Sequence, residues 1–255
     1  MGNIKNYIRS CFNFGVDVDA KQYSPNVKLQ LLEKREYSIY ITPITFQNLK
    51  RLQNECVEYV EKATQIWSKT LNNGISFKII NSTYGADIKV HWAKGTINKG
   101  GICFTEKFSN KNIYNVTIGL LDINGNEYSS KNIYKIIVLE FGHVVGLGHS
   151  EDENDIMYPH WNNVSEPSTN DKLVLNLIYS IGKKSYSESI HLINNYLAKN
   201  SNNNQIIHND RKEEKDIFTE LEELGNINKY NLITQGIDLL NHKIIPSFLY
   251  KTIWE

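Results

Sequence analysis

A helix followed by a glycine turn and a second histidine constrains the fold of this chain more than any other part of its sequence. An apolar helical pattern runs from about residue 132 to residue 145 and contains Glu140 and His143. Gly146 allows the chain to leave this helix sharply, which brings His149 back beside His143. Two imidazoles that converge from a helix and from the loop after it form half of a zinc site.

The same stretch resembles the long zinc-binding signature of the metzincin metalloproteases, His-Glu-x-x-His-x-x-Gly-x-x-His. Its sequence from Glu140 to Ser150 is similar to that of the matrixin branch, and Ile-Met-Tyr-Pro at residues 156–159 resembles the Met-turn beneath the metal. The resemblance covers roughly residues 37–181. It implies a zincin-like α/β (α+β) catalytic domain with a twisted, mostly parallel sheet, an antiparallel edge strand, a long helix and an active-site helix.

The resemblance also implies an activity, a zinc-dependent endopeptidase that hydrolyses peptide bonds in proteins. His143 and His149 would bind zinc, Glu140 would act as the general base, and Met157 would form the floor of the site. An extended peptide or protein substrate would lie antiparallel to the edge strand. The residues of that strand are Gly101, Ile102, Cys103 and Phe104.

One position departs from the family pattern. Leu139 stands where the family has its first zinc histidine, and a leucine side chain has no lone pair to offer a metal. Catalytic zinc normally has three protein ligands, so we expect weakened zinc binding. His160, which is near in sequence, and His91, on a predicted strand, are the candidates for a substitute ligand.

Leu139 leaves three interpretations open. The chain is a zinc endopeptidase that retains activity, or a pseudo-protease that binds peptides or a partner protein without cutting, or an active enzyme in which Leu139 is an engineered or mistaken residue. Restoring a histidine at this position would discriminate among them. The remaining histidines on helical patterns are expected to be structural.

Further metal and cysteine sites are weakly indicated. Calcium at Asp122, Asn124 and Asn126 is conceivable, yet an ordinary Asn-Gly turn explains this loop equally well. No histidine lies between Trp92 and Leu139, so we expect no structural zinc. Cys11 is interpreted as a plain unpaired cysteine in a flexible end, with a loose likeness to the matrixin pro-segment as the minor alternative. The acidic residues at 151–153 and 155 are interpreted as a solvated loop.

The alternation of strands and helices predicts an α/β arrangement with helices packed on one sheet. Residues 1–36 show no sustained period and are expected to be an irregular N-terminal extension. Residues 37–181 form the expected protease-like domain. Residues 182–255 are expected to be a helical C-terminal region with a polar, asparagine-rich linker at 200–215. Strands are expected at 37–42, 75–80, 86–92, 101–104 and 116–120, and helices at 46–67, 132–145 and 171–181.

Charge and composition narrow the partners. The chain of 255 residues has 28 basic and 28 acidic side chains, and this balance argues against nucleic-acid binding. Three scattered cysteines are too few for a disulfide framework or a thiolate zinc site. We expect no membrane span. The start offers no secretory signal, although the similar proteins are commonly exported, so the location stays open. The oligomeric state also stays open.

Overall fold

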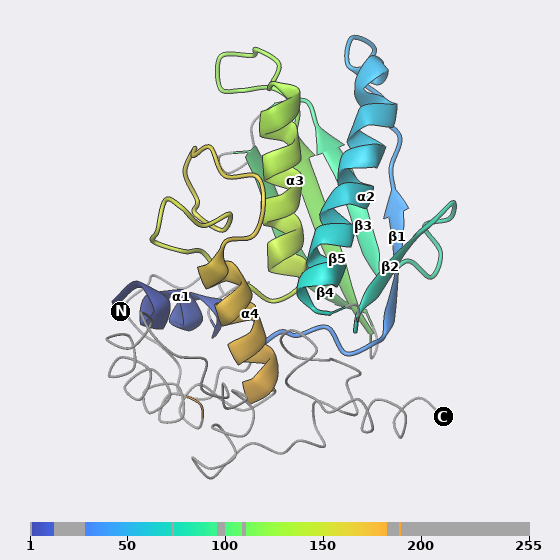
Figure 1. The fold of residues 1–255 in the computed structure, drawn as a ribbon. Coiled ribbons are helices and arrows are strands. Elements are labelled where there is room, and N and C mark those ends of the chain that lie inside the picture. Colours follow the sequence, from blue (N-terminus) through green and yellow to red (C-terminus); the bar gives the residue numbers. More distant parts are fainter. Residues whose placement is uncertain are drawn as a thin grey trace.

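A five-stranded sheet with helices on one face forms the centre of the molecule in the computed structural model (Figure 1). The structure describes residues 2–12, 29–72, 74–95, 100–108, 111–182 and 189. The strands are β1 (Glu36–Ile41), β2 (Ser76–Ile80), β3 (Ile88–Ala93), β4 (Gly101–Phe108) and β5 (Lys111–Gly119). The helices are α1 (Gly2–Phe12), α2 (Gln53–Thr70), α3 (Ser130–Val144) and α4 (Thr169–Ile181), and a 3-10 turn, η1 (Lys50–Leu52), precedes α2.

The sheet is mostly parallel, as the family resemblance implies. Its order is β2-β1-β3-β5-β4, and β4 alone runs antiparallel to its neighbour, with Cys103 opposite Val116. Because β4 stands at the end of this order, it is the antiparallel edge strand that was expected. The fold class is therefore confirmed for the described residues, whereas the C-terminal helices predicted beyond residue 182 lie outside them, Ser189 excepted.

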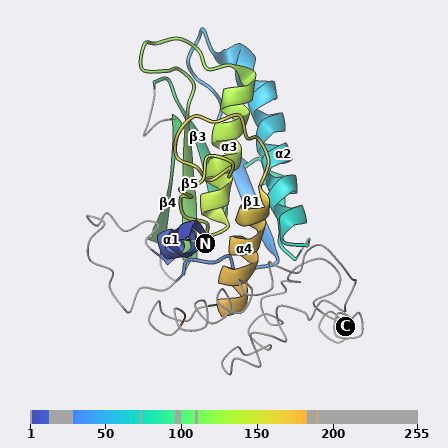
Figure 2. The ribbon, with the colours of Figure 1, turned by 60° about the vertical axis from the view of Figure 1, so that its left-hand side comes forward.

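Two long helices cover one face of the sheet. Strand β3 alternates between buried and half-buried side chains, and its buried residues join the core beneath α2 and α3. Helix α2 presents a buried stripe that ends in Trp67, whose indole Nε1 donates a hydrogen bond to Val138 O of α3 at 2.9 Å. Figure 2 shows from a second side that α2 and α3 lie next to each other over the strands.

Several element boundaries differ from the predicted ones for local reasons. The helix predicted from Phe46 begins only at Gln53, because the chain forms turns and η1 before it. The side-chain Oε1 of Gln53 accepts a hydrogen bond from Ile44 N at 2.6 Å and so ties this segment to the first turn of the helix. Strands β4 and β5 are both longer than predicted, because they continue as a ladder as far as the pair Phe108 and Lys111.

The N-terminal residues correct a prediction. The expectation of an irregular, flexible extension is wrong for residues 2–12, which form α1, and for Cys11, which is buried. Tyr7, Ile8 and Phe12 are also almost completely buried, and α1 packs against α4. Spacing of apolar residues over eleven positions is too short a pattern to identify such a helix, and its stability comes from tertiary packing.

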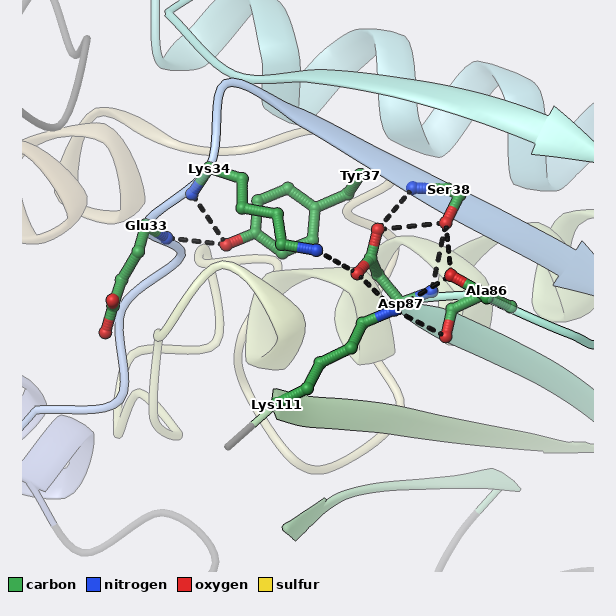
Figure 3. Close-up of polar contacts among 8 residues, drawn as sticks. Glu33, Lys34, Tyr37, Ser38, Ala86, Asp87 and Lys111 are labelled. Carbon is green, nitrogen blue, oxygen red and sulfur yellow. Dashed lines mark hydrogen bonds and ion pairs between the residues drawn. The ribbon is translucent and has the colours of Figure 1, made fainter. Parts of the chain in front are cut away.

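A charged cluster fastens the segment before β1 to the sheet (Figure 3). Asp87, which is 4% exposed, accepts hydrogen bonds from Ser38 N and Oγ and pairs with Lys34 and Lys111. Burial raises the pKa of this carboxyl, but the hydrogen bonds from Lys34, Ser38 and Lys111 outweigh burial and lower it to about 2. The cluster therefore joins residues 34, 38 and 111 through one ionised carboxylate.

No helix in the described part of the chain is long and apolar enough to span a membrane.

Candidate metal centre and general base

Helix α3 carries the first half of the candidate site. Ser129 caps its start by accepting a hydrogen bond from Asn132 N at 3.3 Å, and the helix ends at Val144 against the sheet. Gly146 has a φ of 101°, a conformation that side-chain-bearing residues rarely adopt, and the chain turns back there. The turn returns Leu147 to the helix end, where its carbonyl oxygen lies 2.8 Å from Nδ1 of His143.

That contact fixes the tautomer of His143. A carbonyl oxygen only accepts hydrogen bonds, so Nδ1 carries the proton and donates it, and Nε2 of the neutral ring keeps its lone pair. Burial, and to a smaller extent the neighbouring His149, lower the pKa of His143 to about 3. The imidazole is therefore neutral at physiological pH, which is the form that binds metals.

The two histidines converge as the sequence predicts. His143 Nε2 lies 3.2 Å from Nε2 of His149, which is the exposed residue of the pair. Two nitrogens bound to one tetrahedral zinc at about 2.0–2.1 Å would be about 3.3 Å apart. The spacing of these two nitrogens thus fits adjacent ligand positions of a single zinc ion.

The part of the chain that the structure describes places no third ligand beside the two histidines. Leu139 is half-buried and packs against the hydrophobic core, and in the described residues no three His, Cys, Asp or Glu side chains gather in a way that could hold a metal. His91 lies between Val90 and Trp92, both of which face the core, so its side chain belongs to the other face of the sheet. His160 stacks against Tyr158 with ring centres 5.2 Å apart. Neither substitute ligand joins a cluster of three.

Glu140 lies on the same helix with an unusual environment. Its side chain is 4% exposed, and Oε2 has no hydrogen-bond partner among the described residues. Burial raises the pKa of this carboxyl to about 8. A Cβ on Gly101, the first residue of β4, would come within 2.6 Å of Glu140 Oε1, so only glycine allows the edge strand to approach the carboxyl this closely.

Met157 lies directly under the helix. Its side chain is fully buried, and a Cβ on Gly142 would overlap its Sδ. Its carbonyl oxygen accepts a hydrogen bond from Ser150 N at 3.0 Å, next to His149. The structure therefore places the Nε2 atoms of His143 and His149 side by side, the start of β4 against the carboxyl of Glu140, and Met157 against Gly142.

Residues 105–180 match the model of the peptidase family Matrixin. The match runs from the second half of β4 to the end of α4 and includes both histidines and Met157. It supports a matrixin-like domain, of the zinc metalloprotease type, in this part of the chain. No curated protein matches the chain.

A buried polar network under the matrixin-like site was not predicted. Asp155, interpreted from the sequence as part of a solvated loop, is 1% exposed and accepts hydrogen bonds from Ser150 Oγ at 2.5 Å and Ser168 Oγ at 2.6 Å. That interpretation is wrong for Asp155. Ser168 and Asp171 form a capping box at the start of α4, and the Ser-x-x-Asp spacing is a sequence signal that could have located it.

The loop at Asp122 follows the turn interpretation. Asp122 Oδ1 accepts hydrogen bonds from Asn124 N at 2.9 Å and Asn126 N at 2.8 Å, and Gly125 has a φ of 80°. These bonds lower the pKa of Asp122. The turn accounts for these residues without an ion, so calcium at this loop of the matrixin-like domain stays a prediction.

Proposed function

We propose that the matrixin-like domain is a zinc-dependent endopeptidase that hydrolyses peptide bonds in proteins. The observation that carries the proposal is the convergence of His143 Nε2 and His149 Nε2 at 3.2 Å. Glu140, whose carboxyl is buried, lies about one helical turn before His143 on α3. These two histidines would hold zinc, with Leu139 weakening the site by withholding a third ligand. Zinc, when bound, would lower the pKa of a coordinated water and polarise the scissile carbonyl.

Glu140 would then move the proton. Burial raises its pKa to about 8, and a cation nearby would favour the carboxylate and lower that pKa toward the working range of a general base. Oε2, which has no hydrogen-bond partner among the described residues, would take the proton of the attacking water. It would deliver the same proton to the nitrogen of the leaving amine.

Strand β4 would position the substrate. It stands at the edge of the sheet, paired with β5 on one side, and a Cβ on its first residue, Gly101, would overlap the carboxyl of Glu140. A peptide added antiparallel along residues 101–104 would gain main-chain hydrogen bonds and place one of its peptide bonds near Glu140. We propose residues 37–181 as the protease domain, preceded by residues 1–36 and followed by residues 182–255.

Cleavage of an unfolded protein substrate by the full chain in zinc-buffered solution tests this function. We expect cleavage to stop with a chelator, to return with zinc, and to fall about 10²- to 10⁴-fold in Glu140→Ala. The control is Glu58→Ala, which removes an exposed carboxylate of α2. This variant should cleave the substrate at the wild-type rate. Cleavage that persists unchanged in Glu140→Ala would refute the proposal.

Leu139 favours a second candidate, a pseudo-protease that binds peptides or a partner protein without cutting. Its half-buried side chain packs against the core and would offer zinc no ligand. Leu139→His separates the two candidates. An active enzyme gains zinc affinity and activity from a measurable starting level, whereas a pseudo-protease begins with peptide binding, no stoichiometric zinc and no cleavage.

A further inference from the structure

The C-terminal turn of α1 lies directly against the loop that carries His149. Ser10 Oγ is 2.7 Å from His149 O, and Gly148 N donates a hydrogen bond to Cys11 Sγ at 3.2 Å. The hydroxyl of Ser10 is also 2.7 Å from Tyr7 O, so its single proton is shared between a carbonyl of its own helix and the carbonyl of His149. Two consecutive residues of α1 thus contact the backbone of two consecutive residues of the loop, Gly148 through its N–H and His149 through its carbonyl oxygen.

Gly148 is required by this contact rather than by a turn. A Cβ at position 148 would overlap the carbonyl carbon and the Oγ of Ser10 and would lie 2.5 Å from Ser10 O. Gly146 provides the sharp turn, whereas Gly148 provides close backbone approach. The two glycines of this stretch therefore have different physical roles.

Helix α1 is itself firmly anchored. Tyr7 OH donates a hydrogen bond of 2.6 Å to Asp171 Oδ1 at the start of α4, and Asn6 Nδ2 donates one of 3.0 Å to Glu151 Oε2. Asp171 Oδ2 in turn accepts from Ile156 N at 2.9 Å. Helix α1 therefore contacts the chain on both sides of His149 and links this loop to α4.

We propose that α1 is a clamp that positions His149, with Ser10 and Cys11 as positioning residues that act through the backbone of Gly148 and His149. The significance for metal binding rests on the proposed function, in which His149 is a zinc ligand. His149 is exposed and lies in a loop, so its backbone would lose conformational freedom on binding zinc if α1 did not already hold it. Partners that orient metal ligands typically change affinity 10- to 100-fold, and we expect about 10-fold here.

The test compares Ser10→Ala and Gly148→Ala with Ser38→Ala in the full chain. Ser10→Ala removes the hydroxyl at His149 O, and Gly148→Ala forces α1 away from the loop. Ser38→Ala deletes a hydroxyl that bridges two strands at Asp87, away from the loop. The first readout is amide hydrogen exchange at residues 148–150 in metal-free protein, and the second is the affinity for Co²⁺ and Zn²⁺ followed by absorption spectroscopy and competition.

We expect faster exchange at residues 148–150 in both α1-contact variants, and about 10-fold weaker metal binding in Ser10→Ala with the unfolding midpoint close to that of Ser38→Ala. Unchanged exchange in Gly148→Ala, or equal metal affinity in Ser10→Ala and Ser38→Ala, would overturn the proposal. The exchange arm needs no metal, so a wild-type chain that binds no zinc would refute the proposed function while the exchange result still decides the clamp.

Discussion

Glu140→Gln isolates the cost of ionising a carboxyl inside the metal-free site. Glu140 is buried, its Oε2 has no hydrogen-bond partner among the described residues, and burial raises its pKa from 4.5 to about 8. Glutamine has nearly the same shape and does not ionise. At low pH both side chains are neutral, and at high pH only the wild type has to bury a charge or expose the group.

The pKa gives the size and the sign of the effect. A native pKa above the unfolded value means that the native state retains a proton that the unfolded chain releases, so stability falls as pH rises from about 4.5 to about 8. At about 1.36 kcal/mol for each tenfold change in proton affinity, the full loss is at most about 5 kcal/mol, and relaxation of the site will reduce it to roughly 2–5 kcal/mol. Below pH 4.5 this loss vanishes.

Urea unfolding of metal-free wild type and Glu140→Gln across pH 4.5–8.5 measures this difference. We expect the free energy of unfolding of the wild type to decline relative to that of the variant as pH rises through this range. Parallel pH profiles for the two proteins would refute the assignment of Glu140 as a buried, uncompensated carboxyl, and with it the physical basis for a general base at this position.

Two further predictions concern the scaffold. Asp87→Asn should lower the free energy of unfolding by roughly 2 kcal/mol near neutral pH. The depressed pKa of about 2 means that the Asp87 carboxylate contributes stability above pH 4, and that this contribution disappears as pH falls through 2. Urea midpoints that match the wild type at pH 7 would contradict this. Gly142→Ala should lower the thermal midpoint, since overlap with Met157 Sδ costs about 1–3 kcal/mol and outweighs a helix-propensity gain of about 0.5–1 kcal/mol; a higher midpoint would show that Met157 yields freely.

Local patterns account for the parts of the site that the sequence could predict. The apolar helix, the glycine at 146 and the spacing of His143 and His149 are all local features, and the two rings lie as that spacing predicts. The mostly parallel sheet with β4 at its antiparallel edge is also observed as expected. The sequence alone shows a leucine at position 139, where the family pattern has a histidine, whereas the packing of Leu139 against the core is a property of the structure.

The parts that sequence reasoning missed depend on contacts between distant segments. Cys11 and Gly148 are 137 positions apart, and neither residue type reveals the other as a partner. Asp155 follows the exposed Glu151 and Glu153 in the sequence, and the hydrogen bonds from the hydroxyls of Ser150 and Ser168 compensate for its burial. Helix α1 has too few residues to be identified by periodicity, and its stability comes from packing against α4.

The zinc content of the full chain, measured after equilibration with buffered zinc, tests the central claim most directly. We predict one zinc ion per wild-type chain at saturation, and its loss in His149→Ala, because Nε2 of His143 and Nε2 of His149 would be adjacent ligands of one ion. A wild-type chain that takes up no zinc at saturation, or a His149→Ala variant that binds it equally well, would contradict the account.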